Sequence, residues 1–391
     1  MVKTHKHNAA ILSIAIFYQL FTTSCNNIVD VPEIVSHGIP VYKINISNDD
    51  YGEFVSNEFI NLRVVAELNV DGEKYAVRIK HHGFSSRGNY KKNFSLEYEA
   101  SDPILNKKEV VLSGQSLDPS MLRSYLAVEI FNHTGISTFK LSPIELYVNN
   151  VSNGLYLVIE KIDEEFFEKR NIEAAELYKA IYGNAKFTFQ ENKDVRFGFE
   201  KRFPDDDNYY SLEQLIYMIS SEPKESFPSK IEEVFDVEGY LSYMAASVLM
   251  YNQDGIVHNF QMYKDKRTGK YKILPWDLDS TFGYKLYCTS GYEIEICEFP
   301  GKSDLLTRLL EYSEYREMYR NIYREMLDNC FNPNDLGVKI DEMGQTILTA
   351  YVNDRWIQAK GYDLTTEVIK LKKFIVQRSQ QIEEQLQSFT Y

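Results

Sequence analysis

After its first 25 residues, the 391-residue chain contains no hydrophobic run that approaches the ~20 residues of a membrane-spanning helix. It also has no excess of basic residues: 43 Lys and Arg stand against 57 Asp and Glu, giving a formal net charge of -14. A nucleic-acid-binding surface needs clustered positive charge, so this balance argues against DNA or RNA as a partner. Internal repeats and low-complexity segments are also absent from the sequence. These absences predict a globular protein that is soluble apart from any N-terminal anchor.

Cysteine is scarce, and the spacing of the cysteines matches no zinc motif, since the adjacent His81 and His82 are far from all of them in sequence. Cys288 and Cys297 lie nine positions apart across a turn that contains Gly291. They can pair in an oxidising compartment or remain two free buried thiols, and the sequence favours neither. The four cysteines are Cys25, Cys288, Cys297 and Cys330.

The N-terminus has the pattern of an export signal. Lys3 and Lys6 precede an apolar run of about a dozen residues, which is too short to span a membrane. The run ends in Thr22-Thr23-Ser24-Cys25, which resembles a bacterial lipobox with Thr where Leu is common. We therefore expect residues 1–25 to be a lipoprotein signal, Cys25 to carry the lipid, and residues 26–40 to be a tether. The protein would be exported and lipid-anchored in the cell envelope or on the outer surface of a bacterium.

The remaining chain exceeds one ordinary hydrophobic core, so two lobes are expected. Alternating apolar residues predict strands at 41–46, 62–70 and 75–80, and a hairpin at 144–162 with Asn153-Gly154 as its turn. Helical spacing predicts helices at 118–135, 212–219, 237–250, 305–331, 336–351 and 365–388. The predicted fold class is α+β, with a β-rich N-terminal lobe (41–180) and a mainly helical C-terminal lobe (181–391).

The stretch 250–283 concentrates the groups best suited to chemistry. Asp254 and Asn259 flank a segment expected to be a loop because it contains Gly255. Two strand-like runs follow, joined by a turn at residues 267–269, and the second run leads into Asp277 and Asp279. A hairpin returns its two ends to one place, so these side chains should cluster. Carboxylates with an amide oxygen suit a hard cation such as Mg²⁺, which usually takes one or two carboxylates plus phosphate oxygens.

In these residues the chain resembles the CotH family of spore-coat kinases, which are atypical protein kinases. The resemblance rests on the D-x4-N of Asp254 and Asn259, the strand pair, and the Pro-Trp-Asp-Leu-Asp that ends at Asp279. It implies a two-lobed protein-kinase-like fold and transfer of the γ-phosphoryl group of ATP to a Ser or Thr of a protein substrate. Asp254 would accept the hydroxyl proton. Asn259 and Asp277 would hold Mg²⁺ or Mn²⁺, with Asp279 next to them.

A second family motif, R-G-N-S-[ST]-R followed by K-K, falls on residues 82–92. The chain has His82 in place of the Arg and Phe84 in place of the Asn, which suggests altered specificity. The resemblance implies that Ser85, Ser86 and Arg87 bind the nucleotide. The positions that match the motif are Gly83, Ser85, Ser86, Arg87, Lys91 and Lys92.

Strand parity chooses between the two lysines of this motif. Lys92 shares parity with the apolar Phe94, Leu96 and Tyr98, so it is expected to face the cleft while Lys91 points outward. Lys92 is therefore the lysine predicted to pair with the nucleotide phosphates.

A third motif of the family, N-G-x-Y-x-x-x-E-x-[IV]-[DE], runs from Asn153 to Asp163 and includes Glu160. Glu160 is expected to pair with Lys92, to hold a metal or to orient Arg87. The Leu-Tyr-Lys run at 177–179 would link the lobes and lie against the adenine, as the resemblance implies. The segment 284–299 is expected to contact substrate or cover the cleft.

Two other classes of function stay open at this point. The 29 Tyr and 23 Phe could furnish a surface for binding glycans or partner proteins, without catalysis. Alternatively, Asp254 and Asp277 could act as the acid–base pair of a hydrolase.

Overall fold

The computed structural model describes residues 38–83, 85–181, 185–188, 194–283 and 297–389. The predicted signal with Cys25, the tether up to residue 37, Phe84, Cys288 and most of the segment 284–299 lie outside these ranges, as does the side chain of Ser85. Cys297, which was considered as a partner of Cys288, is a buried free thiol.

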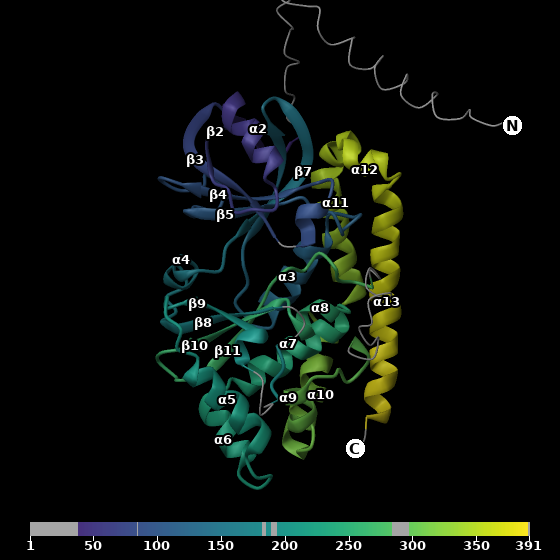
Figure 1. Cartoon of the computed structure of the whole chain (residues 1–391). Coiled ribbons are helices and arrows are strands. Elements are labelled where there is room, and N and C mark those ends of the chain that lie inside the picture. The colour runs from purple at the N-terminus through teal and green to yellow at the C-terminus, as the bar shows by residue number, and fades with distance from the viewer. Residues whose placement is uncertain (1–37, 84, 182–184, 189–193, 284–296, 390–391) are drawn as a thin grey trace, which may run out of the picture. The chain divides into compact units, whose positions relative to one another are not determined.

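Alternating apolar and polar residues in the N-terminal part of the chain form a closed barrel (Figure 1). In β2, for example, Val64, Ala66 and Leu68 point into the barrel and the residues between them face outward or are less buried. The strand order is β1-β2-β3-β4-β5-β7-β6, and a parallel pairing of β1 with β6 closes the ring. The strands are β1 (Val41–Ile46), β2 (Val64–Val70), β3 (Glu73–His82), β4 (Asn93–Tyr98), β5 (Glu109–Ser113), β6 (Leu141–Val148) and β7 (Val151–Glu160).

The predicted β6–β7 hairpin is present, but its turn lies earlier than expected. Asn149 and Asn150 join the strands with φ angles of 47° and 63°, as a two-residue hairpin turn requires, and asparagine tolerates this region well. Asn153 and Gly154, the predicted turn, lie within β7. Gly154 has a φ of 88°, and a Cβ atom there would lie 2.2 Å from Oδ2 of Asp354, so a close approach requires glycine at this position.

A second, four-stranded sheet has the order β11-β10-β8-β9. It contains β8 (Ala174–Ala180), β9 (Phe199–Phe203), β10 (Phe260–Asp265) and β11 (Tyr271–Pro275). The predicted lobe boundary at residue 180 places β8 with the barrel, whereas β8 pairs with β9 and β10. Only the β10–β11 hairpin of this sheet is predicted from the sequence, because the other pairings join segments that are far apart along the chain.

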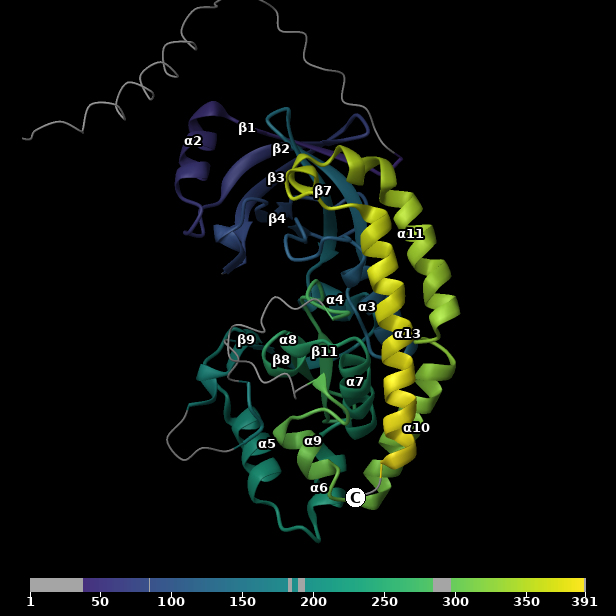
Figure 2. The same cartoon turned by 90° about the vertical axis from the view of Figure 1, so that its right-hand side faces the viewer.

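Helices surround this second sheet and extend back to the barrel (Figures 1 and 2). The predicted α+β class, with a β-rich N-terminal region and a helical C-terminal region, is confirmed. Residues 305–331 form two helices rather than one. No described helix is both long enough and apolar enough to cross a membrane. The helices are α2 (Asn48–Ser56), α3 (Arg123–His133), α4 (Glu164–Glu168), α5 (Tyr210–Ser221), α6 (Phe227–Val234), α7 (Val237–Leu249), α8 (Gln253–Val257), α9 (Asp304–Leu309), α10 (Ser313–Asp328), α11 (Pro333–Asn353), α12 (Arg355–Ala359) and α13 (Leu364–Ser388).

A buried ion pair joins the barrel to the C-terminal helices. Nζ of Lys91 lies 2.8 Å from Oδ2 of Asp354, the residue between α11 and α12, and both side chains are buried. The amide of Leu155 in β7 donates to the same carboxylate oxygen at 2.8 Å. The other oxygen accepts from the amides of Trp356 and Ile357 and caps α12. Lys91, predicted to point outward, is therefore enclosed.

Candidate functional site

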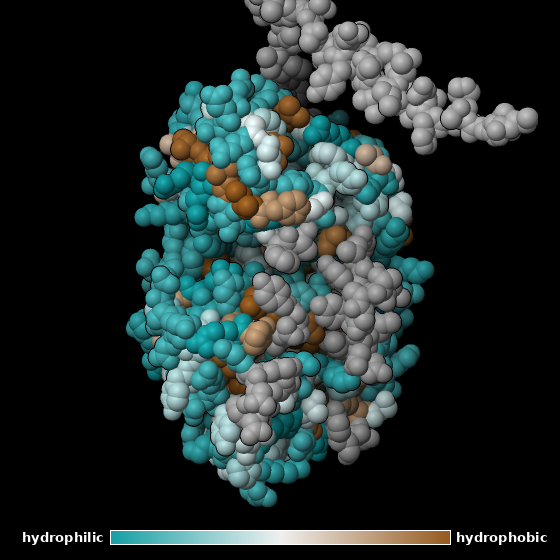
Figure 3. Space-filling model, viewed as in Figure 1, coloured by the Kyte–Doolittle hydropathy of each residue, from teal (hydrophilic) through white to brown (hydrophobic). Residues whose placement is uncertain are grey.

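A cavity of about 600 Å³ lies between the barrel and the second sheet. Figure 3 shows the face of the molecule seen in Figure 1 as largely hydrophilic. Another cavity, of about 800 Å³, is larger, but none of the four side chains singled out in residues 250–283 lines it. All four, Asp254, Asn259, Asp277 and Asp279, line the smaller cavity, so it is the candidate site.

The β10–β11 hairpin brings these residues together as the sequence predicts. Phe260 pairs with Pro275, and the amide of Trp276 donates to the carbonyl of Asn259 at 3.3 Å. The residues that flank the strands therefore lie side by side. The Asn259 side-chain amide donates to Oδ2 of Asp277 at 3.2 Å.

Asp254 lies on the short helix α8 rather than in a loop. Oδ1 of Asn252 caps this helix by accepting from the amide of Gly255 at 3.1 Å, and a Cβ at Gly255 would lie 2.1 Å from the Asn252 side chain. The hydroxyl of Tyr243, in the buried helix α7, donates to the carbonyl of Gly255 at 2.6 Å. The carbonyl of Asp254 itself accepts from the amide of Asn259 at 2.8 Å. Asp254 is therefore held on a rigid support.

Burial raises the pKa values of all three carboxyl groups, and neighbouring carboxylates add to the shift for Asp254 and Asp279. Desolvation, and then the charge of Asp277, raise the pKa of Asp254 to about 7. Asp277 is open to the cavity but surrounded by protein, and desolvation raises its pKa although Lys179 and Asn259 oppose the change. Desolvation and neighbouring carboxylates raise the pKa of Asp279 well above its usual value. Such clusters of perturbed groups in a cavity are typical of functional sites.

The side chains of the cavity can hold a cation such as Mg²⁺ only if oxygens of a bound nucleotide or of water complete its coordination. Among residues 38–389, apart from the gaps in the described ranges, no three His, Cys, Asp or Glu side chains are grouped closely enough to hold a metal by themselves. Mg²⁺ commonly takes one or two carboxylates and completes its shell with water and phosphate. The hydrogen-bonded pair of Asn259 and Asp277, with Asp279 lining the same cavity, meets that requirement.

Lys179 is a cavity residue absent from the predicted site. It lies on β8, opposite Gln261 of β10, so it is on the strand directly next to the β10–β11 hairpin. Desolvation and then Arg202 lower its pKa, whereas the charges of Asp277 and Glu200 raise it. In the sequence, the sign of Lys179 was a single lysine near the end of an otherwise apolar strand, Leu177-Tyr178-Lys179-Ala180. The family resemblance instead implied that this segment contacts the adenine. Tyr178 is fully buried and does not line the cavity.

The barrel contributes fewer of the predicted residues. Ser86 lines the cavity, whereas Arg87 does not. Nε of Arg87 donates to the carbonyl of Gly83 at 2.7 Å, and Nη2 donates to Oδ1 of Asn61 at 2.5 Å. Arg87 therefore binds groups around the Ser85–Gly88 turn and does not line the cavity.

The assignment of Lys92 to the cavity is wrong. Its Nζ pairs with Oε2 of Glu58 at 2.7 Å, and the residue does not line the cavity. Parity fails because β4 begins at Asn93, so the alternation of Phe94 and Leu96 does not extend back through the preceding turn.

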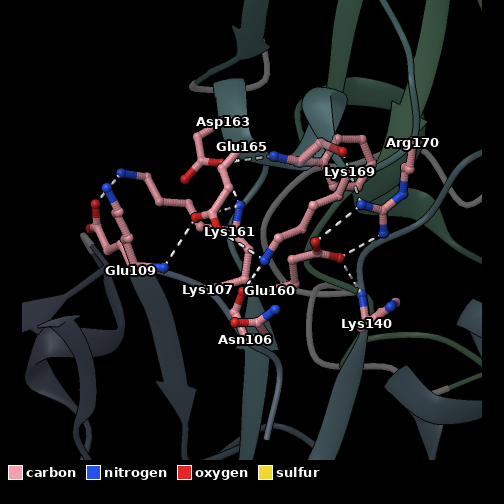
Figure 4. Close-up of polar contacts among 12 residues, drawn as sticks. Asn106, Lys107, Glu109, Lys140, Glu160, Lys161, Asp163, Glu165, Lys169 and Arg170 are labelled. Carbon is pink, nitrogen blue, oxygen red and sulfur yellow. Dashed lines mark hydrogen bonds and ion pairs between the residues drawn. The ribbon is translucent and has the colours of Figure 1, made fainter. Parts of the chain in front are cut away.

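Glu160 pairs with neither Lys92 nor Arg87 and does not line the cavity that holds the proposed metal ligands. Its Oε2 lies 2.6 Å from Nη2 of Arg170 and accepts from the backbone amide of Lys140 at 3.0 Å (Figure 4). It is buried at the end of β7, where the chain leaves the barrel, and it does not line the cavity. Glu160 therefore organises the connection between the barrel and the second sheet.

His82, which stands where the family motif has Arg, adds no positive charge to the cavity. Its Nδ1 lies 2.9 Å from Oγ of Ser95. Desolvation, followed by the charge of Lys179, lowers its pKa to about 3, so the imidazole is neutral at pH 7. Positive charge in the cavity comes instead from the second sheet, through Lys179 and Arg202.

The raised pKa values predict how pH and cations change stability. A carboxyl group whose pKa is higher in the folded state stabilises the fold at low pH, and this contribution is lost as pH rises from the unfolded value of 3.8 through about 7 for Asp254. A cation competes with these protons. Adding Mg²⁺ should therefore raise the melting temperature more at pH of about 8 than at about 5.5.

Differential scanning fluorimetry with and without Mg²⁺ measures this difference. Asp277→Asn should remove most of it. An equal Mg²⁺ effect at both pH values would contradict the assignment of the cluster as a cation site.

The chain is similar to known proteins over most of its length. A family model described as "CotH kinase protein" matches residues 79–382. The inner spore coat protein H of Bacillus subtilis (strain 168) is 25% identical over 356 residues, covering 89% of this chain and 98% of that protein. Invasin CotH3 of Rhizopus delemar is 20% identical over 297 residues, covering 69% of this chain and 49% of that protein. Among solved structures, the Helicobacter pylori proinflammatory kinase CtkA is 12% identical, covers 74% of this chain and 95% of its own, and has a TM-score of 0.29.

Proposed function

The chain belongs to the CotH kinase protein family, and on that premise we propose that it transfers the γ-phosphoryl group of ATP to a Ser or Thr hydroxyl of a protein substrate. The observation that carries this proposal is the convergence of Asp254, Asn259, Asp277 and Asp279 with Lys179 on one cavity. The barrel would be the N-terminal lobe of a kinase-like fold, and the second sheet with its helices would be the C-terminal lobe.

Each residue then has a defined task. Asp254 orients the acceptor hydroxyl and accepts its proton, and a pKa of about 7 suits a general base at neutral pH. Asn259 and Asp277 would hold Mg²⁺ or Mn²⁺, and Asp279 lies next to them. The bound cation would neutralise charge on the phosphates. Lys179 takes the phosphate-binding role that the sequence suggested for Lys92.

This assignment separates two lysines by their expected effects. Lys179→Met should lower kcat/KM for ATP by about 100-fold, because a preorganised positive charge in a partly dry site contributes strongly to phosphoryl transfer. Lys92→Met is the matched control, since Lys92 pairs with Glu58 outside the cavity, and its kcat/KM should change less than about threefold. Steady-state kinetics with γ-labelled ATP measures both. The reverse order of effects would restore Lys92 and reject Lys179.

The basic activity requires its own test. The chain should be incubated with γ-labelled ATP, Mg²⁺ or Mn²⁺, and candidate cell-surface proteins, and label should appear on Ser or Thr. A thermal-shift titration with ATP and Mg²⁺ distinguishes a kinase from a surface binding protein, which would show no nucleotide-dependent shift. Release of product without nucleotide would instead indicate a hydrolase that uses Asp254 and Asp277.

We also propose that the chain acts outside the cytoplasm. The family relative from Bacillus subtilis is described as a spore coat protein, and the N-terminal sequence resembles a lipoprotein signal. Lipidation at Cys25 predicts that Cys25→Ser abolishes incorporation of a labelled fatty acid.

A further inference from the structure

Arg123, the first residue of α3, is a buried cation in contact with the turn that follows Asp277. Its Nε donates to the backbone carbonyl of Thr281 at 3.1 Å. Burying a permanent positive charge is costly unless it is fully paired. The contacts around Arg123 show how the fold meets that cost.

One buried acid pairs closely with the guanidinium, and a second, from another part of the chain, lies at the limit of ion-pair distance. Nη1 of Arg123 lies 2.5 Å from Oδ1 of Asp118, and Nη2 lies 4.0 Å from Oε2 of Glu367 on α13. The other oxygen of Asp118 accepts from the backbone amide of Arg123 at 2.8 Å. A planar guanidinium held at several points is fixed in orientation, which a lysine could not reproduce. Arg123 therefore connects α3, α13 and the turn.

The turn needs such support because its backbone is unusual. Asp277 and Phe282 have positive φ angles, of 58° and 53°, which residues with side chains rarely adopt. Residues in this region persist only where the surroundings determine their conformation, and they concentrate at functional sites. The carbonyl of Thr281, which accepts from Arg123, lies within this strained stretch.

The charge of Arg123 also acts on the cavity. Its guanidinium pairs with Asp118 and contacts the carbonyl of Thr281, in the segment that carries the carboxylates of Asp277 and Asp279. Arg123 is thus a cation beside a cluster of carboxylates that is expected to bind a metal cation. Its positive charge should weaken metal binding, whereas its support of the turn should strengthen it.

We propose that Arg123 is a positioning residue for the metal-binding turn. It holds residues 277–281 in the conformation that directs Asp277 to the cavity. Through its contact with Glu367, this conformation also depends on the position of α13. This inference rests on the proposed function, in which Asn259 and Asp277 are metal ligands.

The test is the affinity of Arg123→Gln for Mn²⁺, measured by electron paramagnetic resonance titration with and without a non-hydrolysable ATP analogue. Removing a positive charge near a cation site would by itself tighten binding. Losing an outer-shell positioning contact instead weakens metal binding by about 10–100-fold. We expect the weakening, together with faster amide hydrogen exchange in residues 277–283.

Two further variants complete the design. Arg308→Gln is the matched control, because Arg308 also donates to backbone carbonyls, but to those of Ile219 and Glu222 at the end of α5 and not to the turn at residues 277–281. Its Mn²⁺ affinity should be unchanged. Glu367→Gln is a milder change at the far end of the contact. Because loss of its negative charge weakens Mn²⁺ binding by itself, its readout is amide hydrogen exchange in residues 277–283, which should become faster and which decides the question if Arg123→Gln does not fold.

Unchanged or tighter Mn²⁺ binding by Arg123→Gln overturns the inference, as does an equal loss in Arg308→Gln. If wild-type protein binds Mn²⁺, Arg123→Gln binds it equally well and amide hydrogen exchange in Glu367→Gln is unchanged, only the inference fails. If the wild-type protein does not bind Mn²⁺ even with the nucleotide analogue, the metal assignment in the proposed function fails and the inference fails with it.

Discussion

Asp254→Asn should lower the rate of phosphoryl transfer by about 10²–10⁴-fold, because it removes the proposed general base while preserving the shape of the side chain. Asp277→Asn should cause a comparable loss through the metal site, since charge neutralisation on the phosphates would fail. Neither change should unfold the protein. The pKa of each group is raised in the fold, chiefly by desolvation, so the ionised forms destabilise the fold without a cation.

The variants should therefore melt at the same temperature as the wild type or higher at pH of about 8 without Mg²⁺. This combination of lost activity and retained stability separates a catalytic role from a structural one. Asp205→Asn, on an exposed loop outside the cavity, is the control and should retain wild-type kinetics. Full phosphotransfer by either Asp254→Asn or Asp277→Asn would refute the proposed mechanism.

The second large effect concerns the ion pair between Lys91 and Asp354. Asp354→Ala should reduce the free energy of unfolding by about 3–5 kcal/mol, because it leaves the Lys91 ammonium buried without its partner. It also removes the acceptor for the amides of Leu155, Trp356 and Ile357. Urea denaturation followed by circular dichroism measures the loss.

Lys74→Met provides the comparison for an exposed pair. Lys74 lies 3.0 Å from Glu67, and both side chains are largely exposed, so this change should cost less than about 1 kcal/mol. The double variant Lys91→Met with Asp354→Asn should be more stable than the sum of the single effects predicts, since neither charge is then left unpaired. A cost for Asp354→Ala as small as that of Lys74→Met would show that the pair does not secure the C-terminal helices.

The sequence was most informative where contacts are local. The β10–β11 hairpin is readable because a turn and two alternating runs fix its ends, and those ends place Asn259 and Asp277 in hydrogen-bond contact. The pairing of β1 with β6 is different, since it joins Val41 to Glu145 and depends on closure of the whole barrel. Nothing local in either segment specifies that partner.

The same distinction explains which site residues could be predicted. Lys179 reaches the cavity only because β8 pairs with β10, a contact between distant segments. Lys92 was misplaced because the alternation of β4 does not continue through the turn before Asn93. Glu160 lies where the motif places it, but Arg170, its partner, comes from the chain beyond α4. Residue type and spacing were enough to identify the carboxylates of the cavity. The basic residues beside them could not be identified in this way, because their positions depend on how distant strands pair.

The junction between α11 and α12 has a consequence for how the protein is made. Because Asp354 reaches Lys91 in the barrel and Glu367 reaches Arg123 beside the carboxylates, the last stretch of polypeptide completes both halves of the molecule. A partly synthesised chain that lacks residues 354–367 would lack these contacts. The proposed phosphotransfer should therefore appear only after this segment has been made and has packed against both parts of the molecule.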